Sequence, residues 1–486
     1  MCSLSEFPLY SNEDQIPLCE LDGKIHCSTS DFLNLHLYTN CVTNHPKVVI
    51  TKDIIQQSYA KVFPGDVFLP GSDSLFQKLQ DAWHERGVTK LFEMLESENN
   101  MAFKVVGKFF CSLQKTYEKA FDLCPFKKKE HFEQRNSSEI VVCMAWHPRC
   151  TKLAVATKDD MITVYSNNCA ITPILKAKAQ KGVTTIAWRP LTSGELAVAC
   201  SVGVYIWTID PNSVVSRTSF NSTLLLPDKY VSSISWSPQG DILMTCNGRD
   251  CLMTAWDPET SRSVMLKWGS GSGVAKLSWS PDGSKLVAAT VSRMFRVWNC
   301  SDWSYESWLT VGGHVSHCVW SNDGLVLLFA TSTEHCIYCL PTAQHVFKNQ
   351  KNAGAYLVAD LTRTQIGSSV VGGQVKGLAW DKSNRYLAVM FQDSPIIAIF
   401  YTNHSPHFEI YPGFFILGLP QELPSYICFQ HNFTSGANLT ICWSSGRVQY
   451  FPMIFNVDVQ SRKPTSELHK SNLHDQTSLF VSFNSP

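Results

Sequence analysis

One sequence motif recurs along most of the chain and limits its fold more than any other feature. Each copy has a β-branched or small residue, a few spacers and an aromatic anchor, and then a turn and a short apolar strand follow. The anchors lie 42, 48, 43, 41, 60 and 49 residues apart, mostly near the roughly 40–45 residues of a WD40 blade. The seven anchors are Trp146, Trp188, Trp236, Trp279, Trp320, Trp380 and Phe429.

Each unit holds three or four short antiparallel strands and cannot bury both of its faces alone. Radial stacking of such units covers the faces and leaves only short edges. The sequence therefore predicts a mainly β fold, a seven-bladed WD40-type β-propeller over residues 139–459, in which each anchor fills the space between adjacent blades. The 60-residue spacing predicts an insertion around Phe347 to Gly373.

Closing the ring requires one more outer strand after the last unit, and two segments could supply it. Residues 453–459 follow directly, whereas Gln15 to His26 has the pattern of a hairpin with Asp22-Gly23 at its turn. We favour the hairpin, which lies in an N-terminal segment of residues 1–60.

A segment of different character, residues 74–124, precedes the propeller. Its apolar residues recur at helical spacing, which predicts a small α-helical insertion. An amphipathic helix usually packs against its own fold, but part of this stripe could instead receive a partner. The candidate partner-binding residues are Trp83, Phe92, Phe109 and Phe110.

Composition narrows the function. Lys and Arg together number 41, as do Asp and Glu, so no net charge attracts polyanions and direct nucleic-acid binding is not expected. Residues 1–8 lack the pattern of a secretory signal, and no apolar run reaches the roughly 18 residues of a membrane span. We expect a reducing compartment, membrane association only through a partner, and a flexible polar tail at residues 460–486.

Three sequence patterns bear on whether the chain has a phosphate-binding, metal-binding or anion-binding site. No phosphate-binding Gly-x-x-x-x-Gly-Lys-Ser/Thr loop is present. Cys336 and Cys339 have zinc-ligand spacing, yet residues three apart on a strand face opposite sides, so we expect no metal and no cofactor. The basic run Lys176 to Lys181 is interpreted as a solvated edge that discourages strand pairing, in preference to an anion site.

The chain resembles the aladin family of WD-repeat nucleoporins. The proline-rich terminal segments associated with that family are absent or short here. The segments that carry the resemblance are Met1 to Leu4, Val183 to Pro190, Glu195 to Cys200, Leu277 to Lys285, Phe295 to Trp298 and Trp443 to Arg447.

This resemblance implies a scaffold of the nuclear pore complex, held at the nuclear envelope by a transmembrane nucleoporin and in contact with other pore components. It also implies roles in nuclear transport and in spindle organisation, with a mitotic location at spindle poles. Two other classes compete with it. One is a propeller that selects substrates for a ubiquitin ligase or carries cargo, and the other is an enzyme with acidic or His residues in the central channel. No repeated inward carboxylate is evident, so we expect no enzyme.

Overall fold

The computed structural model describes part of the chain, and every structural statement below concerns that part. The described residues are 1–8, 16–21, 23–27, 42–48, 50, 140–167, 172–209, 221–225, 230–249, 251–260, 262–267, 273–342, 354–367, 369–404 and 408–455. The chain divides into two compact units, one of residues 1–51 and 138–486 and the other of residues 52–137. The predicted helical insertion, with Trp83, Phe92, Phe109 and Phe110, lies outside the described residues, as does the tail at 460–486.

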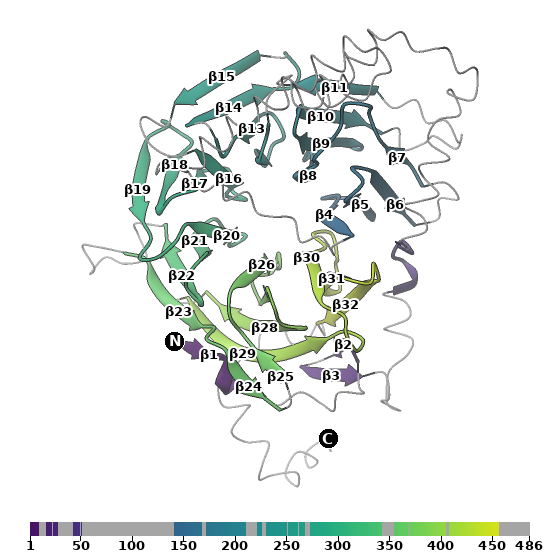
Figure 1. Cartoon of the computed structure of the whole chain (residues 1–486), viewed down its shortest axis with the longest axis vertical. Coiled ribbons are helices and arrows are strands. Elements are labelled where there is room, and N and C mark those ends of the chain that lie inside the picture. The colour runs from purple at the N-terminus through teal and green to yellow at the C-terminus, as the bar shows by residue number, and fades with distance from the viewer. Residues whose placement is uncertain are drawn as a thin grey trace, which may run out of the picture. The chain divides into compact units, whose positions relative to one another are not determined.

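Seven antiparallel blades form the first unit and follow one another in chain order (Figure 1). The first four blades are β4 (Val141–Trp146), β5 (Lys152–Thr157), β6 (Ile162–Ser166) and β7 (Ile174–Leu175); β8 (Thr185–Trp188), β9 (Glu195–Cys200), β10 (Gly203–Thr208) and β11 (Asn221–Leu225); β12 (Ser233–Trp236), β13 (Leu243–Cys246), β14 (Leu252–Asp257) and β15 (Arg262–Lys267); and β16 (Val274–Trp279), β17 (Lys285–Thr290), β18 (Met294–Asn299) and β19 (Tyr305–Leu309). The last three are β20 (Val315–Trp320), β21 (Val326–Thr331), β22 (Cys336–Pro341) and β23 (Tyr356–Asp360); β26 (Val375–Trp380), β27 (Tyr386–Phe391), β28 (Ile396–Asn403) and β29 (Glu409–Leu417); and β30 (Pro424–Phe429), β31 (Gly436–Trp443) and β32 (Val448–Ile454).

The innermost strands close a ring. Each contacts the innermost strand of the next blade, and β30 of the seventh blade contacts β4 of the first. The predicted mainly β, seven-bladed propeller is therefore confirmed.

The core lies between blades because the middle strands are apolar on both sides. In β9, Leu196 and Val198 pack toward blade 1, whereas Ala197 and Ala199 pack toward blade 3. Such a two-sided burial produces the continuous apolar run that the sequence shows at these strands. The clusters between blades replace a single central core.

Tight turns join the first two strands of several blades. At Ser237–Gly240 the amide of Gly240 donates to the carbonyl oxygen of Ser237 at 2.9 Å. Gly240 has a φ of +74°, and a Cβ there would lie 2.5 Å from the carbonyl oxygen of Pro190. Glycine is required at this position both by its backbone angle and by the close approach of the preceding blade.

The N-terminal segment adds outer strands to two blades. Strand β1 (Cys2–Ser3) pairs in parallel with β23 of blade 5, and η1 (Leu4–Glu6) follows it. The hairpin of β2 (Pro17–Leu21) and β3 (Lys24–Cys27) joins blade 7, where β2 pairs in parallel with β32 through Glu20 and Met453. The structure thus places the predicted hairpin on the outer edge of the last blade, beside β32.

The long spacing between blades 5 and 6 contains an added hairpin, β24 (Thr364–Ile366) and β25 (Ser369–Val371). The predicted bounds of the insertion, 347–373, are too wide, because they include β23, which is the regular fourth strand of blade 5. That strand is half exposed and contains no turn residues. Gly, Thr and Ser residues flank it, and they give this part of the sequence the composition of a loop.

Candidate interaction surface of the propeller

The seven predicted anchors all occupy the same position, the last residue of an innermost strand. The Trp188 Nε1 donates to the carbonyl oxygen of Ala145 at 3.0 Å, and the Trp236 Nε1 donates to that of Ala187 at 3.2 Å. Each acceptor directly precedes the anchor of the preceding blade. Trp320 repeats the pattern with Ser278, so the indoles link consecutive blades as well as filling the gaps between them.

The remaining anchors depart from this pattern. Trp146 Nε1 donates to Thr440 Oγ1 of blade 7 at 2.8 Å, and Trp380 Nε1 donates to Thr402 Oγ1 within its own blade. Phe429 is buried in the seam between blades 6 and 7. The Nε1 atom of Trp279 is buried and has no partner among the described residues.

The seam between blades 7 and 1, where the ring closes, is held by polar side chains. His45 Nε2 lies 2.6 Å from Gln430 Oε1 and donates to it, and Asn438 Nδ2 donates to the same oxygen at 2.9 Å. The Asn432 side chain donates across the seam to the carbonyl oxygen of Arg149. Of these contacts, the bond from Asn432 to Arg149 joins blade 7 to blade 1, and the bond of His45 attaches the N-terminal segment to blade 7.

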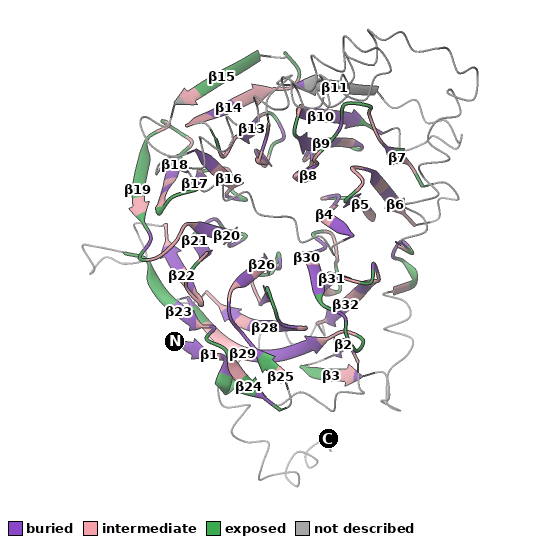
Figure 2. Ribbon diagram, viewed as in Figure 1, coloured by how far each residue is buried: buried purple, intermediate pink, exposed green. Residues whose placement is uncertain are grey.

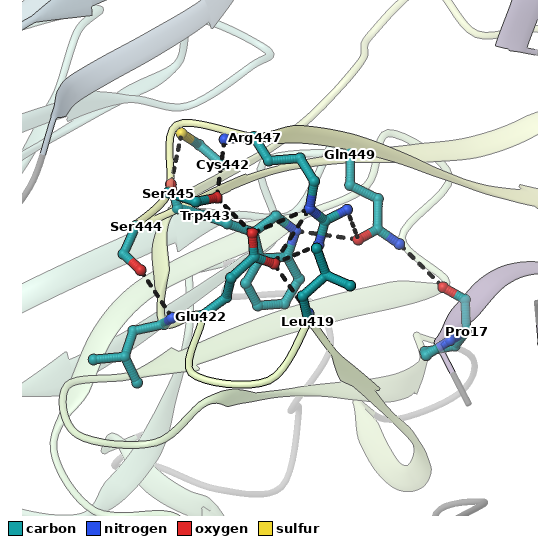
Figure 3. A network of polar contacts seen from close by, with 10 residues as sticks. Pro17, Leu419, Glu422, Cys442, Trp443, Ser444, Ser445, Arg447 and Gln449 are labelled. Carbon is teal, nitrogen blue, oxygen red and sulfur yellow. Dashed lines mark hydrogen bonds and ion pairs between the residues drawn. The ribbon is translucent and has the colours of Figure 1, made fainter. Parts of the chain in front are cut away.

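An ion-pair network in blade 7 fastens the turn between β29 and β30 (Figure 3). Arg447 Nη2 donates to Glu422 Oε2 at 2.6 Å, while Leu419 N donates to the same oxygen and Ser445 Oγ to Oε1. Burial alone raises the pKa of the Glu422 carboxyl, but hydrogen bonds from Arg447 and Ser445 outweigh it and hold the pKa below its usual value. Glu422 is therefore an ionised, fully partnered carboxylate at neutral pH.

The same network reaches the N-terminal hairpin. Gln449 Oε1 accepts bonds from Arg447 Nη1 and from Trp443 Nε1, each at 3.1 Å. The Gln449 amide nitrogen then donates to the carbonyl oxygen of Pro17 in β2 at 3.0 Å (Figure 3). The blade 7 network thus orders the strand that covers the blade's outer edge.

Glu20 attaches the hairpin to blade 6. Its Oε1 accepts hydrogen bonds from the hydroxyls of Tyr386 at 3.1 Å and Tyr401 at 3.3 Å. Its Oε2 is buried and has no partner among the described residues. Burial raises the pKa of Glu20 to about 7, although the two tyrosine hydroxyls act in the opposite direction.

The outer strands of blades 3 and 4, β15 and β19, are largely exposed (Figure 2). No described strand pairs with the outer edge of β15 or of β19. Large apolar side chains on and next to these strands are unusually exposed, to 73% for Leu309 and 77% for Val311. We call this surface the open rim, and its apolar members are Val264, Met265, Tyr305, Leu309 and Val311.

The described residues offer little reactive chemistry. They contain no group of three or more His, Cys, Asp or Glu side chains able to hold a metal ion. Burial raises the pKa of the Cys246 thiol to about 12 and that of Cys318 to about 11, so these thiols stay protonated. Within the described ranges, no helix is long and apolar enough to cross a membrane.

Sequence reasoning missed several of these features. In the basic run Lys176 to Lys181, Gln180 is buried, and its amide bonds the carbonyl oxygen of Asp160 and the indole of Trp207. The open rim also escaped notice, although the succession of Tyr305, Trp308, Leu309 and Val311 after a third strand is a usable signal for an apolar outer edge.

The fold also relates the chain to known proteins. A family model described as the Aladin seven-bladed propeller matches residues 128–454. The protein named Aladin from Arabidopsis thaliana is 27% identical over 348 residues, which cover 65% of this chain and 76% of that protein.

More distant similarities are confined to shorter stretches. The nuclear distribution protein nudF of Aspergillus niger is 25% identical over 39% of this chain and 41% of its own length. Among solved structures, the Cps50 (Swd1) β-propeller domain of Myceliophteria thermophila aligns with a TM-score of 0.49 at 13% identity, covering 64% of this chain and 96% of that domain.

Proposed function

The chain belongs to the aladin seven-bladed propeller family, and from that premise we propose that it is a protein-docking scaffold of the nuclear pore complex at the nuclear envelope. The observation that carries this proposal is the family match over residues 128–454, which spans every blade. The scaffold acts by presenting surfaces and performs no chemistry.

The physical basis of the role is rigidity. Blades linked by anchor indoles and closed by polar contacts hold their loops and edges at fixed positions, so several partners can bind at once without ordering the platform. The open rim supplies an exposed apolar surface of the kind that marks interaction sites.

Attachment to the nuclear envelope is part of the same proposal. A transmembrane nucleoporin supplies the anchor, and other pore components bind the remaining surface. Roles in nuclear protein import and in spindle organisation, including a location at spindle poles, follow from the family resemblance and are proposed with it. The candidate anchoring residues Trp83, Phe92, Phe109 and Phe110 remain a prediction.

Proximity labelling in dividing cells tests this proposal. A biotin ligase fused to the full chain is expected to label transmembrane nucleoporins and soluble pore components. A matched chain with Trp83→Ala and Phe92→Ala is expected to lose the transmembrane label if the predicted stripe makes the anchoring contact. Labelling of ubiquitin-ligase subunits, without nucleoporins, would replace the scaffold proposal by the adaptor alternative.

A further inference from the structure

The propeller already shows how a blade of this protein accepts an additional strand. Strands β1 and β2 come from outside the repeats: β1 pairs in parallel with β23, the fourth strand of blade 5, and β2 pairs in parallel with β32 and supplies the fourth strand of blade 7. The residues after β1 then enter the seam between blades 5 and 6, where Leu4 is fully buried and the Phe7 ring stacks on Phe415 with centroids 4.6 Å apart. An added strand therefore gains both backbone pairing and a seam for its apolar side chains.

Strand β19 of blade 4 presents the same kind of edge without an added strand. Its inner side pairs with β18 from Tyr305 to Leu309, and no described strand pairs with its outer side. No Pro or bulge interrupts this pairing, and three of its five residues are polar or aromatic groups exposed to solvent. Leu309 is exposed as well, and because natural proteins usually protect the edges of their sheets, this edge is suited to accept a further strand.

The acidic side chains at this edge favour a partner segment with basic residues. Between Cys300 and Val311 the chain carries Asp302 and Glu306 and no Lys or Arg. Arg296 in β18 is engaged within the blade, since its guanidinium lies 4.1 Å from the Tyr305 ring centroid and its Nε donates to Ser307 Oγ. Lys285 lies near Glu306 and is the cation of this chain that faces it, and the Lys285 amino group also donates to the carbonyl oxygen of Thr342.

The seam beside β19 contains an unpaired donor. Trp308 packs in the cluster between blades 4 and 5, and its Nε1 is buried without a partner among the described residues. A buried indole N–H without an acceptor is costly, and a carbonyl from an added strand could pair with it. This position relative to β19 corresponds to the seam that receives Leu4 and Phe7 beside β23.

We propose that β19 receives a strand from a partner protein, an extended segment with alternating apolar side chains and with Lys or Arg facing Glu306. It adds in parallel to the outer edge, as β1 adds to β23, with its apolar residues on the face of Leu309 and its basic residue on the opposite face, which Glu306 shares with Trp308. The inference rests on the proposed docking function and names the class of ligand for the open rim. Strand β15 is the less suitable edge because Arg262 gives it a basic end.

A library of random 12-residue linear peptides displayed on phage, panned against the purified full chain, tests this assignment. We expect recovered peptides to alternate apolar and basic residues. Synthetic copies should slow amide hydrogen exchange within residues 305–309 at least tenfold. Affinity for the Glu306→Lys variant should fall at least fivefold, because like charges would then face each other.

Proline scanning supplies the backbone test. Successive amides of a strand point to opposite sides, so one of Glu306→Pro and Ser307→Pro removes an outward N–H and the other removes a bond to β18. The variant that keeps the parent melting temperature is expected to bind the peptides at least tenfold more weakly. The matched control Ser263→Pro, on β15, should leave affinity unchanged. If both proline substitutions in β19 unfold the chain, the affinity of the Glu306→Lys variant and the amide exchange of residues 305–309 test the proposal instead.

Three results would overturn the inference: no peptide enriched above background, peptides that protect another segment, or affinities unchanged by the β19 substitutions. The assay uses purified chain and peptides, so its failure would leave targeting to the nuclear envelope intact. Conversely, a chain absent from the envelope could still bind peptides at β19, and the two proposals can therefore fail separately.

Discussion

The carboxyl of Glu20, in the N-terminal hairpin, accepts a hydrogen bond from the hydroxyl of Tyr386 in blade 6 across a separation of 366 residues. The hairpin pairs with blade 7, so this bond links the outer edge of blade 7 to blade 6. A buried carboxyl at this junction makes the contact between the hairpin and blade 6 sensitive to protonation.

The first prediction concerns that sensitivity. Burial raises the pKa of Glu20 from 4.5 to about 7 in the folded chain, so the folded state binds the proton more tightly than the unfolded state. The contribution of Glu20 to the free energy of unfolding should therefore fall as the pH rises from about 4.5 to about 7, by about 3 kcal/mol, and level off above that, as the difference between the parent chain and Glu20→Gln. Urea unfolding from pH 4.5 to 8.5 measures this slope, and Glu20→Gln should remove it.

A matched control acts in the opposite direction. The pKa of Glu422 is lowered, so its stabilising contribution is present at neutral pH and is lost on acidification through the folded pKa. Glu422→Gln should leave the decline between pH 4.5 and 7 in place. Parallel stability curves for the parent chain and Glu20→Gln would contradict the junction that we describe.

The second prediction concerns the ion pair of blade 7. Arg447→Ala leaves Glu422, whose side chain is 8% exposed, without its cation. We expect a loss of about 2–3 kcal/mol in unfolding free energy, less than for a fully buried pair because Arg447 itself is 32% exposed. Amide exchange in residues 17–27 should also accelerate, since Gln449 loses its orienting partner. The control is Arg363→Ala, whose exposed pair with Asp393 should contribute less than about 1 kcal/mol; equal losses would refute the assignment.

The third prediction compares two anchors. Trp188→Phe removes a hydrogen bond to Ala145 and also leaves that carbonyl unsatisfied, whereas Trp279→Phe removes an N–H that had no partner. Both lose similar ring volume, so Trp188→Phe should cost about 1–2 kcal/mol more. Chemical denaturation of the two variants measures the difference, and equal costs would mean that the indole bonds between blades contribute nothing.

The fourth prediction concerns a turn. Gly240→Ala forces a side chain into a φ of +74° and against the carbonyl oxygen of Pro190, and should cost about 2 kcal/mol or more. Gly354 has nothing within 4 Å of an added Cβ, so Gly354→Ala should leave the melting temperature nearly unchanged. Thermal unfolding distinguishes the two, and tolerance at Gly240 would show that the turn can shift away from Pro190.

The sequence predicts the parts of this fold that repeat. Trp188 and Trp236 were identifiable because each propeller seam needs the same bulky residue at the same strand end, and repetition makes such a residue visible. A hairpin could be expected at Asp22-Gly23 because its turn chemistry is local. Both signals are independent of where the segments meet in space.

The remaining features depend on contacts that occur only once. The partnership of Glu20 with Tyr386, and that of Gln180 with Trp207, join segments of no recognisable local pattern. Strand β1 has only two residues and carries no periodicity, so its pairing with β23 was not predictable. The sequence from Tyr305 to Val311 signals an apolar outer edge, but only the structure shows which outer strands receive an added strand among the described residues.

Live-cell imaging of the full chain fused to a fluorescent protein at its endogenous level tests the central claim most directly. The account predicts a punctate nuclear rim that coincides with pore markers in interphase cells. Diffuse cytosolic fluorescence, with the fusion intact and the propeller folded, would contradict a scaffold of the nuclear pore complex.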